Sequence, residues 1–237
     1  PRQLEIIPYT LLGRSTETRL DLGMDVRYGL TSNSIMKMTF NPDFGQVEAD
    51  PSVLNLTAFE TFYDERRPFF SEGAEFFSQR LSLFHSRRIG RAPSYNLPEE
   101  GELEDAPDYT TILGATKVMG NTASGINYGL IGAITAEESA TLVIDSADVQ
   151  SVKEIVIEPR TNYTIGRFEV PMINDISRVG LMFTDVSRKN NPGATVAGMD
   201  WDFGFLDNRL FSNGQIVRSD NNITGNAIRF NLGYMDP

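Results

Sequence analysis

The chain contains no cysteine and a single histidine, His85, among its 237 residues. Without cysteine, neither a disulfide framework nor a thiolate metal site can form. With one histidine, a zinc site built from several histidines cannot form either. His85 stands beside Ser86 in a stretch without regular alternation, and we interpret it as a loop or packing residue.

Positive charge and long apolar runs are also scarce. The chain has 21 Lys and Arg residues against 32 Asp and Glu residues, a net charge of −11. Because phosphate affinity needs a clustered positive face, no nucleic-acid partner is expected. No apolar run approaches the roughly 18–20 residues that a membrane-spanning helix needs. The opening residues, PRQLEIIPYT, show no charged-then-apolar leader, and we expect the chain to be an interior piece of a longer protein.

The strongest positive signal is an alternation of apolar and polar residues with a period of two, which is typical of half-buried strands. Residues 197–205 show it clearly, with Ala197, Met199 and Trp201 alternating with Gly198 and Asp200. About eleven strands, many of roughly 8–11 residues, are predicted in this way. They lie at 4–12, 20–28, 35–41, 53–60, 112–118, 126–135, 163–170, 178–186, 197–205, 210–218 and 227–234. Residues 137–159 are partly strand-like.

One face of these strands is apolar, and the other is rich in Gly, Asn, Thr, Asp and Arg. This pattern predicts an all-β, antiparallel up-and-down meander that forms part of a transmembrane β-barrel, with the small polar face toward the lumen and the apolar face toward lipid. Aromatic residues near strand ends are consistent with interfacial girdles, namely Tyr28, Tyr128, Tyr163, Trp201 and Tyr234. The alternative is a soluble β-sandwich binding module, which also alternates.

Residues 68–109 interrupt the alternation. A connection of this length within a compact domain tends to be functional. We expect it to fold inward or to cap one end as a plug-like insertion within a single barrel region, 1–237, with a short helix around residues 74–83. Its paired phenylalanines, in PFFSEGAEFF, are predicted to pack against the rest of the protein or to present aromatic faces to a ligand.

Charged residues concentrate in and just after the block 38–73. We predict that they form an ion-pair network in the lumen or bind a ligand there. The candidates are Asp43, Glu48, Asp50, Glu60, Glu65, Arg66, Arg67, Glu72, Arg87, Arg88 and Arg91.

The segment NPDFGQVEADPSVLNLTAFETFYDERRPFFSEG resembles part of a family of outer-membrane β-barrel proteins of Gram-negative bacteria. Matching patches follow in the family's order, including SRRIGRAP at 86–93, TILGATKVMG at 111–120 and VAGMDWDF at 196–203. In that family the barrel follows a domain similar to family 9 carbohydrate-binding modules. The resemblance therefore implies an outer-membrane location, contact with outer-membrane lipid, a possible carbohydrate ligand, and N- and C-terminal parts of the protein beyond this chain.

Two further site hypotheses remain open on the residues. A surface glycoside hydrolase would need an acid and a second carboxylate about 5–10 Å apart, and Glu48 with Asp50 could share one strand face. A Ca²⁺ site is conceivable from Asn41, Asp43 and Asp50, although the DxDxDG pattern is missing. No catalytic residue and no metal ligand is assigned, and no cofactor is expected.

Overall fold

The computed structural model describes residues 3–14, 18–42, 64–93, 101–146, 149–174, 176–207 and 209–235. These residues form two antiparallel sheets and three short helical turns. The predicted all-β antiparallel meander is confirmed at this level. The predicted strand at 53–60 lies outside the described residues.

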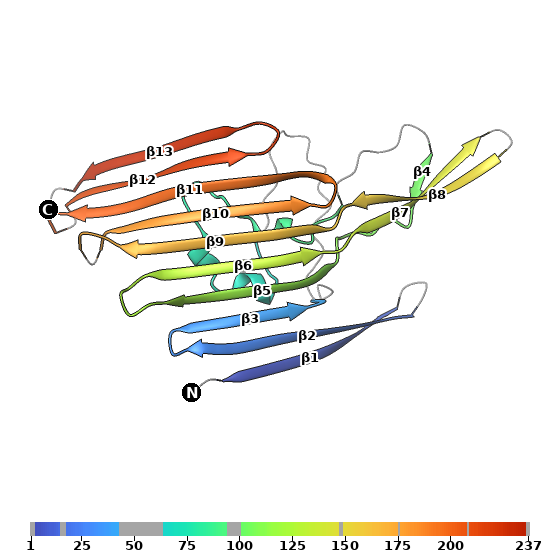
Figure 1. Ribbon diagram of the computed structural model, residues 1–237, viewed down its shortest axis with the longest axis horizontal. Helices are drawn as coiled ribbons and strands as arrows, with labels where there is room; N and C mark the ends of the chain where they lie inside the picture. Colours follow the sequence, from blue (N-terminus) through green and yellow to red (C-terminus); the bar gives the residue numbers. More distant parts are fainter. Residues whose placement is uncertain are drawn as a thin grey trace.

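The larger sheet has ten strands in the order β1-β2-β3-β5-β6-β9-β10-β11-β12-β13 (Figure 1). All of its neighbouring strands are antiparallel. They are β1 (Leu4–Arg14), β2 (Thr18–Thr31), β3 (Ser34–Phe40), β5 (Ile112–Asn121), β6 (Asn127–Thr135), β9 (Thr161–Pro171), β10 (Arg178–Arg188), β11 (Asn191–Phe205), β12 (Leu210–Asp220) and β13 (Gly225–Tyr234).

The partly strand-like stretch of the sequence is a hairpin that belongs to a second, three-stranded sheet. This sheet contains β4 (Glu102–Glu104), β7 (Glu138–Ser146) and β8 (Val149–Glu158). It extends beyond one end of the ten-stranded sheet (Figure 1). Because β6 pairs directly with β9, the hairpin is an insertion that leaves the order of the large sheet undisturbed.

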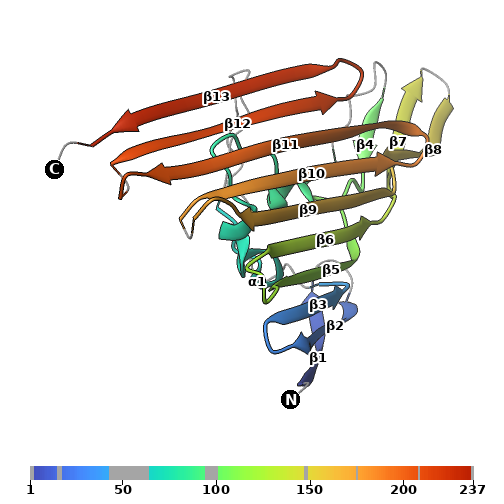
Figure 2. The same ribbon diagram turned by 60° about the vertical axis from the view of Figure 1, so that its left-hand side comes forward.

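The ten-stranded sheet is open, with β1 and β13 at its two edges (Figure 2). No pairing joins these edge strands to each other in the part of the chain that the structure describes. The described residues form no closed barrel, so the prediction that the meander is part of a transmembrane barrel is not confirmed by the fold. Among the same residues, no helix is long and apolar enough to cross a membrane.

One face of the large sheet, here called the outer face, is apolar and exposed. A row of paired residues crosses four strands on it, from Leu181 to Met199, Ile216 and Ile228. Leu181 is 53% exposed and Ile228 is 73% exposed. Strict alternation places every second residue of each strand on this face, so the apolar rows that the sequence predicts form one continuous surface.

The opposite face, here called the inner face, is covered by residues 64–93, which we call the inner segment. It contains α1 (Pro68–Ser71) and the 3₁₀ turns η1 (Ala74–Phe77) and η2 (Ser86–Arg88). The expected helix at 74–83 is only the single turn η1, because Ser78 and Gln79 already have no helical structure. The inner segment lies along one side of the sheet (Figure 2).

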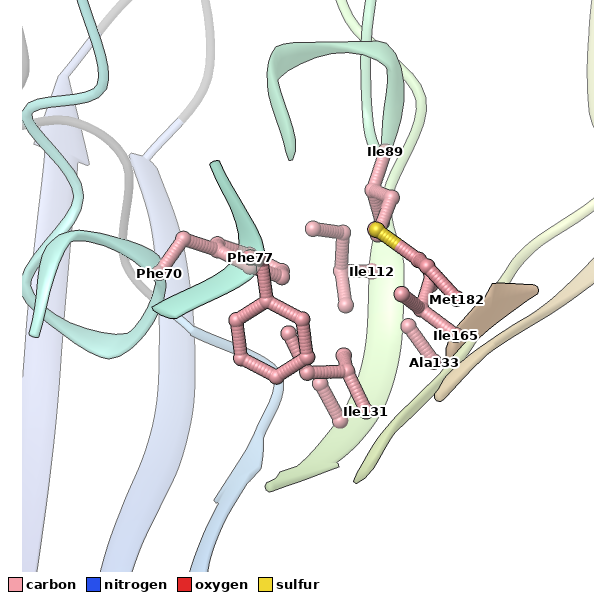
Figure 3. Packing of buried hydrophobic residues seen from close by; sticks show 9 residues of the cluster. Phe70, Phe77, Ile89, Ile112, Ile131, Ala133, Ile165 and Met182 are labelled. Carbon is pink, nitrogen blue, oxygen red and sulfur yellow. The ribbon is translucent and has the colours of Figure 1, made fainter. Parts of the chain in front are cut away.

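A small hydrophobic core joins the inner segment to the inner face (Figure 3). Phe70, Phe77 and Ile89 from the inner segment are buried there, and Phe77 packs edge-on with Phe84. The sheet contributes Ile112, Ala115, Ile131, Ala133, Ile165 and Met182. The paired phenylalanines therefore pack against the sheet, which is one of the two arrangements that the sequence predicts.

Two positions depart from the predicted face. A register shift between Ile112 and Gly114 turns Ile112 into the buried core, although simple alternation places it with Gly114. Tyr163, predicted for an aromatic girdle, packs against the core in register with Ala133 and lies on the inner face. A bulge turns the residues on one side of it toward the opposite face of the sheet. Tyr163 shows that an aromatic residue near a strand end can lie on the inner face.

Candidate functional site: the charged contact between the inner face and residues 64–93

Arg67 and Glu65 form a buried ion pair inside the inner segment. The Arg67 guanidinium donates to both carboxylate oxygens of Glu65, at 2.8 and 2.7 Å. It also donates to the carbonyls of Ile89 and Ser86, at 2.6 and 2.7 Å, and stacks 4.4 Å over the Phe70 ring. One side chain thus ties the start of the inner segment to its last turn.

Burial disfavours the ionised form of Glu65, but the hydrogen bonds and the charge of Arg67 outweigh it. The Ser86 hydroxyl also donates to the Glu65 carboxylate. The net result is that the pKa of Glu65 lies below its ordinary value of 4.5. Glu65 is therefore a charged structural partner at neutral pH.

Lys117 of β5 is buried on the inner face beneath the first turn of the inner segment. Its ammonium group donates to the backbone carbonyls of Phe69 and Glu72 and lies 5.1 Å from the centre of the Phe69 ring. Its cross-strand neighbour Lys37 forms an ion pair with the Glu72 carboxylate. Two lysines of the sheet therefore hold Phe69 of α1 and Glu72, the residue that follows the helix.

Arg167 of β9 and Asp200 of β11 form a buried bidentate ion pair across β10, with N–O distances of 2.9 and 3.1 Å. The strand between them presents Gly180 in register with Asp200. A Cβ atom at Gly180 would lie 2.6 Å from the Asp200 carboxylate, so glycine leaves the space that the pair uses. Gln79 of the inner segment donates to the same carboxylate.

Two further contacts fix the middle of the inner segment. Arg80 forms a bidentate pair with Asp202, at 2.9 and 2.6 Å, at a half-exposed position. Gln215 of β12 is fully buried, and its amide pairs with the backbone of Leu81. The inner segment is thus held by polar contacts to four strands, β3, β5, β11 and β12, in addition to its apolar core.

Beyond Leu81 the inner segment leaves a cavity of about 460 Å³ between itself and strands β9–β11. Arg88 and Arg91 of the inner segment and Arg188 of β10 line this cavity together with His85. The apolar part of its lining includes Phe84 and Val196. It is a predominantly cationic cavity in an acidic chain.

The predicted site residues fall into four groups in the structure. Asp43, Glu48, Asp50 and Glu60 lie outside the described residues. Glu65 and Arg67 pair with each other, Glu72 pairs with Lys37 in place of the expected arginine, and Arg88 and Arg91 line the cavity. Arg66 is exposed and Arg87 is half-buried with a buried Nε atom.

No arrangement of the described residues supports the hydrolase or the calcium hypothesis. Both described carboxylates of the predicted cluster, Glu65 and Glu72, are paired with cations. No group of three or more His, Asp or Glu side chains that could hold a metal ion occurs within the described ranges. Asp43 and Asp50, the proposed calcium ligands, lie outside those ranges.

Sequence reasoning missed Lys37, Lys117, Arg167, Asp200 and Gln215. The available signal was their place in the alternation, because each occupies the face opposite to the apolar row of its strand. A long polar side chain on that face is a candidate for contact with an inserted segment.

Comparison with protein-family models gives one finding: residues 1–235 match a family described as a domain of unknown function (DUF5916). No curated protein and no solved structure matches the chain. The family description mentions neither a membrane location nor a carbohydrate-binding domain, so these two implications of the resemblance stay predictions.

Proposed function

The chain belongs to the DUF5916 family, and we propose that its ten-stranded sheet is part of the wall of an outer-membrane β-barrel. In this proposal the outer face meets lipid, and the inner segment fills the interior as a plug. The role is that of a non-enzymatic membrane protein that binds a ligand or controls its passage.

The observation that supports the proposal most strongly is the exposed apolar face. Contiguous apolar patches larger than a few hundred Å² are rare on soluble monomers. Phe230 and Leu232, 62% and 60% exposed, extend the surface that Leu181 and Ile228 define. Hydrocarbon would accept these side chains, whereas water penalises each by about 1.5–3 kcal/mol relative to full burial.

The polarity of the two faces points the same way. The sheet turns Lys117, Arg167 and Asp200 toward the inner segment, while Trp201, Phe203 and Phe205 alternate away from them along β11. Met24, Val26 and Tyr28 share the outer face with this row, since the register continues from β2 through β3, β5, β6, β9 and β10 to β11. In a soluble β-sandwich these apolar rows would line a dry central layer, but here the core lies on the opposite face.

The connections also fit a membrane wall. Transmembrane strands need about 9–11 residues, and the four consecutive strands β9 to β12 each have eleven or more. At one end of the sheet the connections are 32–33, 122–126, 172–177 and 206–209. At the other end the chain leaves the sheet after β3 and returns to it before β5, and the β7–β8 insertion also emerges there, next to the short turns at 189–190 and 221–224 (Figure 1). Short turns on one side and long insertions on the other are typical of outer-membrane barrels.

The test is membrane integration of the full-length protein in a Gram-negative host. We expect it in the outer-membrane fraction, released by detergent and not by alkaline wash. Ile228→Arg, on the outer face of β13, should lower the integrated fraction, because arginine on the lipid face costs about 2–4 kcal/mol at the bilayer midplane. Asn231→Arg, on the inner face of the same strand, is the matched control. Recovery of the full-length protein in aqueous buffer without detergent would contradict the proposal.

A further inference from the structure

The cavity of about 460 Å³ beside the inner segment has the size of a small-molecule site. One wall is the end of the inner segment, including Phe84 and Ile89, and the other is formed by β9, β10 and β11. Arg188, the last residue of β10, lines the cavity and places it at the end of the sheet that holds the β10–β11 turn. The β7–β8 insertion emerges at the same end of the sheet (Figure 1).

The charge of the lining is opposite to that of the chain. Three guanidinium groups, from Arg88, Arg91 and Arg188, line the cavity, against the single carboxylate of Asp185. Asp185 accepts a hydrogen bond from Thr195 at 2.8 Å. Since the whole chain has a net charge of −11, this local excess of positive charge is set by the fold, which brings residues nearly a hundred positions apart to one place.

Two of these arginines have no ion-pair partner in the described part of the chain. Arg91 is fixed through its backbone, because its carbonyl accepts hydrogen bonds from the amide and hydroxyl of Thr110, at 2.9 and 2.8 Å. Arg188 donates only to the carbonyl of Pro192, at 3.2 Å. The guanidinium groups of Arg91 and Arg188 therefore keep hydrogen-bond donors available to a ligand in the cavity.

We propose that this cavity binds a small organic anion, with a carboxylate or phosphate group held by Arg91 and Arg188 and an apolar body against Phe84 and Val196. A guanidinium presents its donors in a planar fork that matches both anionic groups. Cationic and apolar side chains line the cavity on both the segment and the sheet, and this mixed lining selects an anion with an apolar body over a bare inorganic ion. The site does not depend on whether the outer face meets lipid.

Binding is tested with three aromatic probes that share an apolar body: benzoate, phenyl phosphate and neutral benzyl alcohol. Ligand-observed NMR and calorimetry on the purified full-length protein should show binding of the two anions and none of the alcohol. The relative affinity of benzoate and phenyl phosphate separates carboxylate from phosphate recognition. Affinity should fall as NaCl is raised.

Variants identify the site. Arg91→Gln with Arg188→Gln should weaken binding of the anion by about tenfold or more, since each charge-assisted hydrogen bond contributes strongly. Lysine at both positions should give an intermediate affinity. Arg178→Gln is the control, because Arg178 lies on β10 near its opposite end and pairs with Glu169. Absence of anion binding by the wild type, equal binding of benzyl alcohol, or unchanged affinity of the folded double variant would overturn the proposal.

Discussion

Gln215 and Leu81 are joined by two hydrogen bonds that imitate a pair of strands. The Leu81 amide donates to Gln215 Oε1 at 2.7 Å, and Gln215 Nε2 donates to the Leu81 carbonyl at 3.0 Å. Gln215 has no exposed surface. A side-chain amide of the sheet thus pairs with both the N–H and the C=O of one residue in the inner segment. Without these partners, burying the two backbone groups would cost free energy.

Gln215→Leu removes both partners of the Leu81 backbone. We expect the free energy of unfolding to fall by about 2 kcal/mol or more, because a buried unsatisfied donor or acceptor costs about 1–3 kcal/mol. Urea unfolding measures the change, and limited proteolysis should cut the inner segment faster. Asn231→Leu, at an exposed position of β13, is the control. Equal stability of Gln215→Leu and the wild type would show that the Leu81 backbone has other partners.

Asp200→Leu leaves Arg167 charged and buried without its main partner. The expected loss of stability is about 3–5 kcal/mol, the range for a broken buried pair. Asp202→Leu breaks the half-exposed pair with Arg80 and should cost about 0–1 kcal/mol. Thermal or urea unfolding of the two variants compares them directly.

A double variant, Arg167→Met with Asp200→Leu, separates the charge from the packing. It should regain much of the stability that Asp200→Leu loses, because no uncompensated charge remains. If the double variant is as unstable as the sum of the two single variants, the loss comes from packing around Phe76 and not from the ion pair.

Glu65→Gln tests the pH dependence of the Arg67 contact. The folded-state pKa of Glu65 is lowered from 4.5, so its carboxylate contributes stability above the unfolded pKa and loses it as the pH falls through the folded pKa. The wild type should therefore be more stable than Glu65→Gln at pH 7. The difference should shrink below about pH 4.5. Unfolding curves at a series of pH values provide the measurement, and a pH-independent difference would contradict the assignment.

Gly129→Val should displace the inner segment. A Cβ atom at Gly129 would lie 2.6 Å from Phe77 Cζ and 2.8 Å from Phe76 Cδ1, and overpacking of this kind costs about 1–3 kcal/mol. Gly132→Val lies on the same strand, and nothing lies within 4 Å of its added Cβ. We expect Gly132→Val to be neutral in unfolding measurements. Equal effects of both variants would show that strand propensity, not the aromatic contact, sets the result.

The strands were largely predictable because alternation is a local property. Apolar residues at every second position of 197–205 or 227–234 give the strand and its two faces before any partner is known. The inner segment was predictable as an interruption of that pattern between 68 and 109. Its path over the sheet was not, since it follows from contacts such as Gln215 with Leu81, 134 residues apart.

The charged contacts were also predictable only in part, because they depend on distant parts of the chain. The sequence pointed to Glu65, Arg67 and Glu72 because they lie in a dense charged block. It did not point to Arg167 or Asp200, which occur singly on strands. Which carboxylate meets which cation depends on register, since Arg167 reaches Asp200 across the glycine of an intervening strand.

The sequence alone determined that this protein is built of antiparallel strands with one apolar and one polar face, because side-chain direction in a strand depends only on odd or even position. Only the tertiary structure decided what lies against each face. Residues 64–93 cover the polar side and leave the apolar side exposed, and the bulge at Ile112 assigns that residue to the core. The physical reason is that the segment that covers a face can come from anywhere in the chain. Which segment does so depends on the free energy of apolar burial and charge pairing summed over the whole contact.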